Sequence, residues 1–512
     1  MPELYTTSSS RGRWILISTI FASGSSFLMG SVVSIALPTI QRELNTSLSH
    51  LQWVVNVYLL ALASLLLIGG SLGDRYGRKK VFASGIAIFG LGAALSGFAW
   101  SPESLIVFQA FQGVGAALMV PGSLTIINVC FEPGNRGKAI GLWSGISAGL
   151  ASVGPFLGGG LVETWSWPAV FFFVVPFVIC ALIITLKFVP ETRNEYAKKL
   201  DWPGAVMILL ALVGISLGLI QGPDFGWSHP LVLTGLLGGA ASFVAFFLIE
   251  RRSSSPLVPL GIFRNMKVSG ANIVTLFLYF SLNALIFFLS FNLQQIQGFS
   301  PSVAGLATLP PIILITFLSG YGGALADRHG PRRLMILGPL AVAIGMAWLA
   351  FAGVGASYWT AFLPGLILFG GGMAFVIAPL TKSALEVRDE LSGVASGVNN
   401  AVARLAGLLA IAILGAVMSV TFSGRLVESA RTSSLSTDHQ DYVIAHQEEL
   451  AGLSVPDHWS GEQKEISRQI IRQSFTEGFR LVIGISAALA FLSALVSFVT
   501  IRNRRSAAPD GQ

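Results

Sequence analysis

Charged residues are scarce in this chain. Only 11% of the 512 residues are Asp, Glu, Lys or Arg, whereas 53% are hydrophobic and the mean hydropathy is +0.71. A soluble protein of this length cannot hide so much apolar surface in one or two cores. The composition therefore excludes an ordinary soluble protein and predicts an integral membrane protein that is surrounded by the lipid bilayer.

The residue patterns of enzymes and metal sites are also missing. The two cysteines, Cys130 and Cys180, have no metal or redox spacing. We find no Ser-His-Asp arrangement, no His-rich cluster and no phosphate-binding Lys loop. The sequence predicts a protein that is not an enzyme and has no cofactor. A metal site among the acidic and His residues of 422–477 is less favoured than a solvated loop, because no ligand pair there has a defining spacing.

Long apolar stretches fill most of the chain. A hydrocarbon core of about 30 Å is crossed by about 20 helical residues. Regular polar alternation, which would indicate a transmembrane barrel, does not occur. We therefore predict an all-α integral membrane fold with fourteen transmembrane helices, at residues 14–37, 51–72, 80–100, 103–125, 138–162, 167–189, 202–221, 231–249, 268–292, 302–325, 334–354, 358–381, 392–420 and 479–501.

Lys and Arg residues predict the orientation. Placing the N-terminus in the cytoplasm puts most basic residues of the short loops on the cytoplasmic side and leaves only Arg42 in the short outer loops. Both termini are therefore predicted to be cytoplasmic. This bias explains the formal charge of +7 and leaves no support for a nucleic-acid partner.

One short pattern occurs twice, each time as a charged break between two apolar stretches. Repetition of a whole half explains the matching offsets better than chance does. The Gly residues predict a tight turn, and the Asp can accept hydrogen bonds from a helix N-terminus. A loop that only sets topology would explain the basic residues but not the repeated Gly and Asp. The first copy contains Gly70, Asp74, Arg75, Gly77, Arg78 and Lys79, and the second contains Gly323, Asp327, Arg328, Gly330 and Arg332.

These two loops resemble the signature of the major facilitator superfamily between helices 2 and 3 and its counterpart in the second half. With fourteen spans, the chain further resembles the drug:proton antiporter branch of multidrug efflux transporters. The resemblance implies a 6+2+6 arrangement of helices. It predicts a first six-helix bundle at 1–200, two linker helices within 201–267, and a second bundle at 268–512 with a long outer loop at about 422–477.

The resemblance also implies a function. It predicts a secondary active transporter of the plasma (inner) membrane that works as a monomer and exports small amphipathic compounds by alternating access, with the proton gradient as energy source. The fifth apolar window supports export, since it contains a pattern similar to the antiporter motif of exporting members. A Gly-rich helix that only packs closely is the alternative for that pattern, which comprises Gly154, Pro155, Gly158 and Gly159.

Among the positions that depart from the family pattern, two stand where the family has a charged membrane residue. Where the branch has a membrane Asp in helix 1 and an Arg in helix 4, this chain has Met29 and Gln109. Both lie roughly 10 to 12 Å from the outer face at about 1.5 Å per residue. Because an isolated charge inside the bilayer costs about 2.5 to 3.5 kcal/mol, we hypothesise that this neutral pair replaces an ion pair. An uncoupled facilitator and a non-transporting membrane sensor therefore remain alternatives.

A few polar residues remain inside the predicted spans. Arg404 is the deep charge, and no Asp or Glu lies deep in any span to offset it. An intramembrane charge either faces a polar pathway or bonds backbone carbonyls as a structural group. We predict a pathway for neutral or weakly acidic compounds, although each neutral polar side chain could instead connect helices. The candidate pathway residues are Met29, Asn56, Tyr58, Gln109, Gln112, Asn283, Asn399, Asn400 and Arg404.

Overall fold

The computed structural model describes residues 4–194, 201–387 and 391–501. The predicted boundary after residue 200 and the outermost residues of both end segments lie outside these ranges. The helices are α1 (Ser10–Glu43), α2 (Leu48–Tyr76), α3 (Arg78–Gly97), α4 (Pro102–Cys130), α5 (Pro133–Thr164), α6 (Pro168–Phe172), α7 (Val175–Phe188), α8 (Trp202–Phe225), α9 (Pro230–Arg252), η1 (Leu260–Arg264), α10 (Met266–Phe291), η2 (Asn292–Ile296), α11 (Pro301–Ala307), α12 (Leu309–His329), α13 (Pro331–Ala350), η3 (Tyr358–Phe362), α14 (Leu363–Ala384), α15 (Ser392–Arg431), α16 (Thr437–Ala445), η5 (Gln447–Gly452) and α17 (Gly461–Thr500).

Within these ranges, fourteen helical segments are long and apolar enough to cross a membrane. This confirms the predicted all-α membrane fold. Some segments comprise two helices, as where α6 and α7 together form the span Pro168–Phe188 and α11 and α12 form Pro301–His329. The breaks coincide with Pro residues, which cannot donate a backbone hydrogen bond: Pro176 opens α7, and Pro310 and Pro311 open α12.

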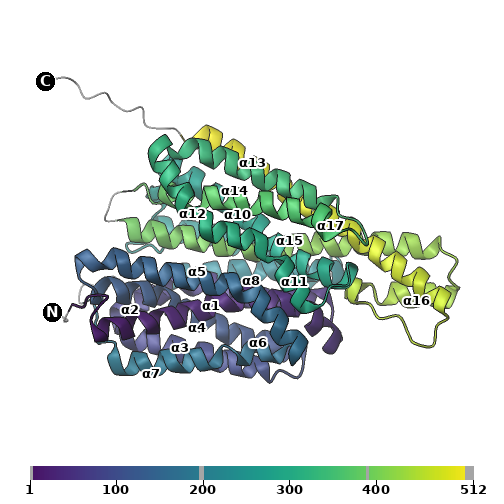
Figure 1. The fold of residues 1–512 in the computed structure, drawn as a ribbon, viewed down its shortest axis with the longest axis horizontal. Coiled ribbons are helices and arrows are strands. Elements are labelled where there is room, and N and C mark those ends of the chain that lie inside the picture. Colours follow the sequence, from purple (N-terminus) through teal and green to yellow (C-terminus); the bar gives the residue numbers. More distant parts are fainter. Residues whose placement is uncertain (1–3, 195–200, 388–390, 502–512) are drawn as a thin grey trace.

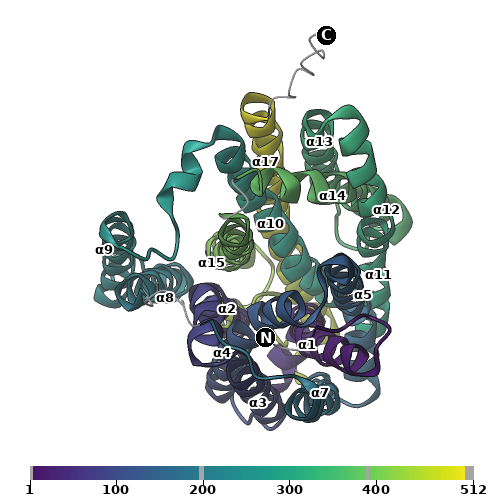
Figure 2. The same ribbon diagram turned by 90° about the vertical axis from the view of Figure 1, so that its left-hand side faces the viewer.

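The helices form two groups that lie side by side (Figure 1). We call α1–α7 the N-bundle and α10–α17 the C-bundle. Helix α1 begins and α17 ends at one end, which we call the terminal end, and α1 ends and α2 begins at the opposite, distal end. Helices α8 and α9 pack against each other at the edge, where α8 also contacts α2 and α15 (Figure 2).

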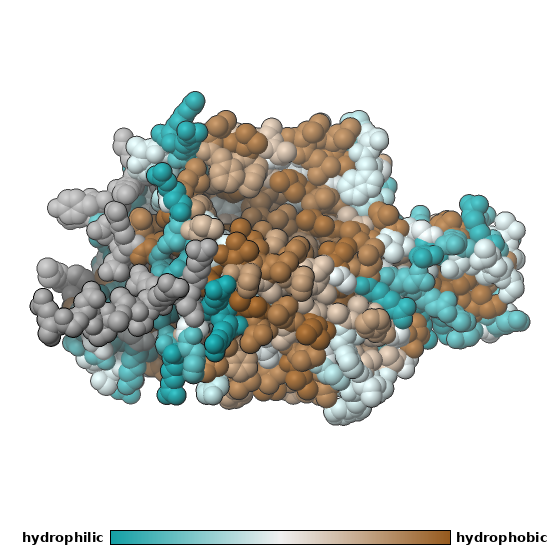
Figure 3. Space-filling view, turned by 90° about the horizontal axis from the view of Figure 1, so that it is seen from above, coloured by the Kyte–Doolittle hydropathy of each residue, from teal (hydrophilic) through white to brown (hydrophobic). Residues whose placement is uncertain are grey.

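The surface carries the apolar belt that a bilayer requires. A broad hydrophobic zone covers the middle of the molecule, and hydrophilic residues gather toward both ends (Figure 3). Large apolar side chains of the membrane-length helices are exposed, such as Leu237 of α9 (68%) and Phe317 of α12 (76%). Apolar patches of this size indicate a membrane-facing surface rather than contact with water.

The segment predicted as a long outer loop is mostly helical. Both α15 and α17 contain 40 residues, about 60 Å at 1.5 Å per residue, so each reaches far beyond a hydrocarbon core of about 30 Å. A capping box between Ser460 and Gln463 begins α17 well before its apolar part. The extension projects at the distal end and holds α16 and η5 between the two long helices (Figure 1).

The two repeated patterns are also more helical than the sequence predicts. Helix α2 continues through Tyr76 and α12 through His329, so each predicted loop is a turn of one residue. That residue is Gly77 in the first copy and Gly330 in the second, with φ angles of 114° and 81°. Only Gly adopts such angles without steric cost, which explains why both copies need Gly at this place.

Gly77→Ala should lower the stability of the folded protein by about 1 to 3 kcal/mol, since the backbone would be strained. The added Cβ would also lie 2.7 Å from Oε1 of Glu191, the oxygen that accepts the backbone N–H of Lys79. Thermal unfolding of the purified protein measures the effect. Gly238→Ala in α9 is the control, because its Cβ meets nothing within 4 Å and Ala favours helix. Equal melting temperatures for the two variants would contradict the prediction.

Candidate functional site

A central cavity of about 640 Å³ lies between the two bundles. Helices α1, α2, α4 and α5 form one side of its wall, and α10, α14 and α15 form the other. Large apolar side chains, among them Phe27, Met29 and Trp143, cover much of the N-bundle side. The polar side chains of the lining are Ser26, Ser31, Ser34, Tyr58, Gln109, Ser144, Asn283, Thr381, Ser396, Asn400 and Arg404.

Most of the predicted pathway residues line this cavity or a smaller one of about 270 Å³ beside it. The central lining includes Met29 and Gln109, so the two neutral replacements face the same space. Gln109 also donates a hydrogen bond of 3.3 Å to Ser96 Oγ. The residues that meet in the linings are Met29, Tyr58, Gln109, Asn283, Asn400 and Arg404 in the central cavity and Asn283, Asn399, Asn400 and Arg404 in the smaller one.

Two predicted pathway residues do not line these cavities. Asn56 and Gln112 are fully buried at 0% exposure, and their amide groups have no hydrogen-bond partner among the described residues. Gln112 packs where α4 meets α3, because a Cβ added at Gly92 would lie 2.6 Å from the Gln112 backbone nitrogen. Asn56 and Gln112 remain candidate pathway residues only because their side chains are polar, since neither lines a described cavity.

Arg404 is the charged residue of the central lining. Its guanidinium carbon lies 5.7 Å from the ring centre of Phe27, across the cavity in the N-bundle. Among the described residues it has no ion-pair partner and donates no hydrogen bond to a backbone carbonyl, so the structural alternative for this Arg finds no support. Asn399 has a packing role, since its amide donates to Thr275 Oγ1 at 2.8 Å and to Asn272 Oδ1 at 3.3 Å.

Several lining residues were not predicted from the sequence. Ser396 lies four residues before Asn400 and eight before Arg404, so the three share one face of α15. This spacing of four residues is the feature of the sequence that indicates Ser396 as a lining residue. Phe27, Trp143 and Thr381 gave none, because isolated aromatic or hydroxyl residues in apolar helices are more often packing groups.

The two bundles are joined at the distal end. Gln41 of α1 donates to the backbone oxygen of Glu449 in the extension and accepts from Gln295 of η2, at 2.8 and 2.9 Å. Glu163 of α5 accepts from Ser300 Oγ and the backbone N–H of Ser302, at 2.8 and 3.0 Å. These contacts join the two bundles on the distal side of the cavity, and we call them the distal closure.

The antiporter-type motif lies beside these hydrogen bonds and contributes further contacts to the distal closure. Gly154 and Gly158 pack against Ser31 and Val32 of α1, and Gly159 packs against the backbone of Pro301 in the C-bundle. In return Gly305 of α11 packs against the backbone oxygen of Pro155. The absence of side chains at these glycines therefore lets α5 approach both α1 and α11 at backbone distance.

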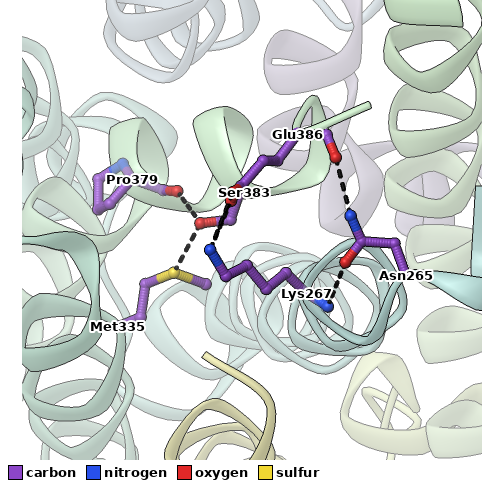
Figure 4. A network of polar contacts seen from close by, with 6 residues as sticks. All are labelled: Asn265, Lys267, Met335, Pro379, Ser383 and Glu386. Atoms are coloured by element: carbon purple, nitrogen blue, oxygen red, sulfur yellow. Dashed lines mark hydrogen bonds and ion pairs between the residues drawn. The ribbon is translucent and has the colours of Figure 1, made fainter. Parts of the chain in front are cut away.

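At the terminal end, the ion pairs between described residues lie within each bundle. Asp74 pairs with Arg78 at 2.8 Å in the first repeated pattern, whereas Asp327 of the second pairs with Lys382 of α14 at 2.5 Å. A neighbouring network joins the start of α10 to the end of α14 through the ion pair of Lys267 with Glu386, 2.9 Å (Figure 4). Each bundle is thus tied internally at this end.

Other repeated-pattern residues contact the same bundle. Lys79 Nζ donates to the backbone oxygen of Leu186 at 2.8 Å, and Arg332 donates to that of Phe498 at 3.2 Å. The guanidinium of Arg332 also lies 5.1 Å from the Phe498 ring centre, and that of Arg75 lies 5.7 Å from the Tyr76 ring. These contacts stiffen each bundle rather than connect the two.

Comparisons with known proteins agree with this architecture. Residues 19–411 match the family model of the Major Facilitator Superfamily. The tetracenomycin C resistance and export protein of Streptomyces glaucescens is 32% identical over 492 residues, covering 94% of this chain and 90% of its own. The puromycin resistance protein pur8 of Streptomyces alboniger is 35% identical over 430 residues, covering 83% of this chain and 85% of its own.

Solved structures share the fold. A bacterial homolog of the human lysosomal transporter Spinster, in an inward-facing and occupied conformation, superposes with a TM-score of 0.68. The alignment covers 96% of this chain and 97% of the other at 16% sequence identity. The likeness therefore concerns the arrangement of helices alone.

Proposed function

This chain belongs to the Major Facilitator Superfamily, and we propose on that basis that its central cavity is the substrate site of an exporter. Because relatives over most of its length are drug resistance and export proteins, it is a transporter of the drug efflux type and not an enzyme. Its substrates are small amphipathic compounds that cross the membrane through the cavity between the bundles.

Alternating access follows from where the bundles are joined. Hydrogen bonds between described residues of the two bundles lie at the middle of the helices or in their distal halves. Gln52 Nε2 of α2, for example, donates to the backbone oxygen of Ile411 in α15 at 2.5 Å. The terminal end has ion pairs within each bundle. The bundles therefore rock about the cavity, opening one end as the other closes. The division of the chain at 201–267, with α8 and α9 as linker helices, gives each bundle this freedom.

The positive-inside bias supports a cytoplasmic position for the terminal end and both chain termini. With that orientation in the plasma membrane, the distal closure makes the described state inward-facing. A substrate enters from the cytoplasm or the inner leaflet and leaves after the distal closure opens. One chain supplies both bundles and the whole cavity lining, which supports a working monomer.

The lining composition supports neutral or weakly acidic substrates. Arg404 is the one charged side chain among the residues of the central cavity, and none of them is Asp or Glu. A lipophilic cation would meet a positive charge without a countercharge, which is costly in a low-dielectric space. The proposed substrate class depends on this observation, that the described cavity lining contains one Arg and no acidic residue.

Energy coupling has two candidates. The family resemblance supports proton-coupled export, with Asp74 and Asp327 as acids of the repeated patterns. An uncoupled facilitator is the second candidate, because the cavity lining has no carboxylate and both Asp residues are engaged in ion pairs at the terminal end.

Efflux measurements test the proposed function. Cells that express the protein should retain less of a neutral or weakly acidic amphipathic dye than cells without it, and survive higher doses of such drugs. Addition of a protonophore should abolish the difference under proton coupling, and it should also do so for a facilitator that moves an anion with the membrane potential. A difference that persists would favour a facilitator of neutral compounds. Equal dye retention with and without the protein, across a panel of such compounds, would overturn the exporter assignment.

A further inference from the structure

The central cavity continues into two chemically different spaces. On one side it shares Asn283, Thr381 and Arg404 with the cavity of about 270 Å³, which we call the polar pocket. On the other side it shares Ser31, Ser34, Leu282 and Ile286 with a cavity of about 60 Å³, which we call the apolar pocket. The three spaces adjoin one another at these shared side chains, and together they outline a passage with a polar and an apolar end.

In the polar pocket most hydrogen-bond donors are already used. The amide of Asn283 donates to the backbone oxygen of Tyr279 at 2.7 Å, and that of Asn400 donates to the backbone oxygen of Ser396 at 3.0 Å. Thr381 donates to the backbone oxygen of Ile377 at 3.0 Å. Thr381 can therefore present only an acceptor to a bound molecule, and each of the two Asn amides keeps a single N–H donor.

Arg404 is different from these neighbours. It carries five N–H donors and a permanent charge, and no acceptor or acidic group among the described residues engages it. Its described partner is the ring of Phe27, a weak contact compared with a carboxylate. An Arg near the middle of a membrane protein without a countercharge favours an anionic group from outside the chain.

The apolar pocket is suited to a hydrocarbon body. It is lined mainly by aliphatic and aromatic side chains, including Leu285, Leu289, Ile312 and Phe369. The distance between the two ends can be estimated along helix α10, because its residue Tyr279 lines the polar pocket and its residue Leu289 lines the apolar pocket. Ten residues at about 1.5 Å each separate them, so the passage is about 15 Å long.

We propose that the transported species is an amphipathic anion about 15 Å long, whose acidic group pairs with Arg404 and whose apolar body points toward Leu289 and Phe369. This inference rests on the proposed function of the central cavity as substrate site and names its substrate class. The anion neutralises the guanidinium, and Phe27 covers the pair. Carboxylates, phenolates and sulfonates share the required chemistry.

Three probes with one apolar body test the charge requirement. Pyrene carrying a butyl chain that ends in a sulfonate, a hydroxyl or a trimethylammonium group is titrated into the protein in lipid nanodiscs. Energy transfer from tryptophan to pyrene reports binding, and Trp143→Phe identifies the part that comes from the cavity. The sulfonate should bind at least about tenfold tighter than the alcohol, as a charge-assisted bidentate contact does, and the trimethylammonium weakest.

Variants of Arg404 then separate charge from packing. Arg404→Gln should remove the advantage of the sulfonate over the alcohol, Arg404→Lys should keep part of it, and Arg480→Gln, an exposed Arg of α17 outside the linings, should change nothing. Leu289→Gln should weaken sulfonate and alcohol by a similar factor. Equal affinities for the three probes would overturn this inference alone, whereas no cavity-dependent binding of any probe would also overturn the cavity as substrate site.

Discussion

Replacing Gly159 and Gly305 together with alanine should lower the export rate at least about tenfold. A Cβ at Gly159 would collide with the backbone oxygen of Pro301, and one at Gly305 with that of Pro155. Backbone atoms cannot swing away as a flexible side chain can, so α5 and α11 must separate. Overpacking of this kind costs about 1 to 3 kcal/mol per site, and 1.4 kcal/mol changes a population tenfold. The distal closure, and with it the proposed inward-facing state, should become rare.

Two measurements on one preparation check this result. The initial efflux rate in proteoliposomes gives the functional loss. Spin labels at the exposed positions Trp165 and Val303, in a background without Cys130 and Cys180, report the separation of α5 from α11. The distance should lengthen in the double variant. Gly160→Ala is a closely matched control, since it changes the neighbouring residue of the same helix and its Cβ meets nothing within 4 Å. A double variant with normal rate and distance would show that this contact does not form the gate.

The sequence predicts the membrane helices well, because burial in lipid demands long apolar runs. The sequence does not predict the helical segments outside the membrane, because those segments need no apolar run. The distal parts of α15 and α17 are polar, and hydropathy detects the surrounding solvent rather than the backbone hydrogen bonds. The local signal for an early start of α17, Ser460 with Gln463 three residues later, is a capping pattern and not an apolar one.

Site residues are harder to predict, because type and depth do not give the direction in which a side chain points. Gln109 lines the cavity, but Gln112, three residues on, is turned about 60° around the axis of α4 and packs toward α3. Asn56 lies two residues before Tyr58, which places the two on nearly opposite faces of α2. Only the packing of neighbouring helices determines which face meets the cavity.

A membrane potential alone, without a pH gradient, should drive accumulation of a permanently charged sulfonate probe. The inferred anion and Arg404 together leave the loaded cavity neutral, whereas the empty cavity carries one positive charge. One elementary charge therefore crosses the membrane in each cycle. At 100 mV this charge is worth about 2.3 kcal/mol, which corresponds to an accumulation of about 50-fold at equilibrium. In a cell with a negative interior the same force drives the anion outward.

Proteoliposomes separate this mechanism from proton antiport. With valinomycin and a potassium gradient that makes the interior positive, the sulfonate should accumulate inside at equal pH, and Arg404→Gln should not support accumulation. With equal potassium and valinomycin the potential is zero, and a pH gradient should then drive nothing, because the described lining has no carboxylate to carry a proton. A sulfonate does not cross in a protonated form, so passive uptake cannot mimic the result. Accumulation driven by the pH gradient at zero potential would instead place a proton on Asp74, Asp327 or another acid in every cycle, and would establish antiport despite Met29 and Gln109.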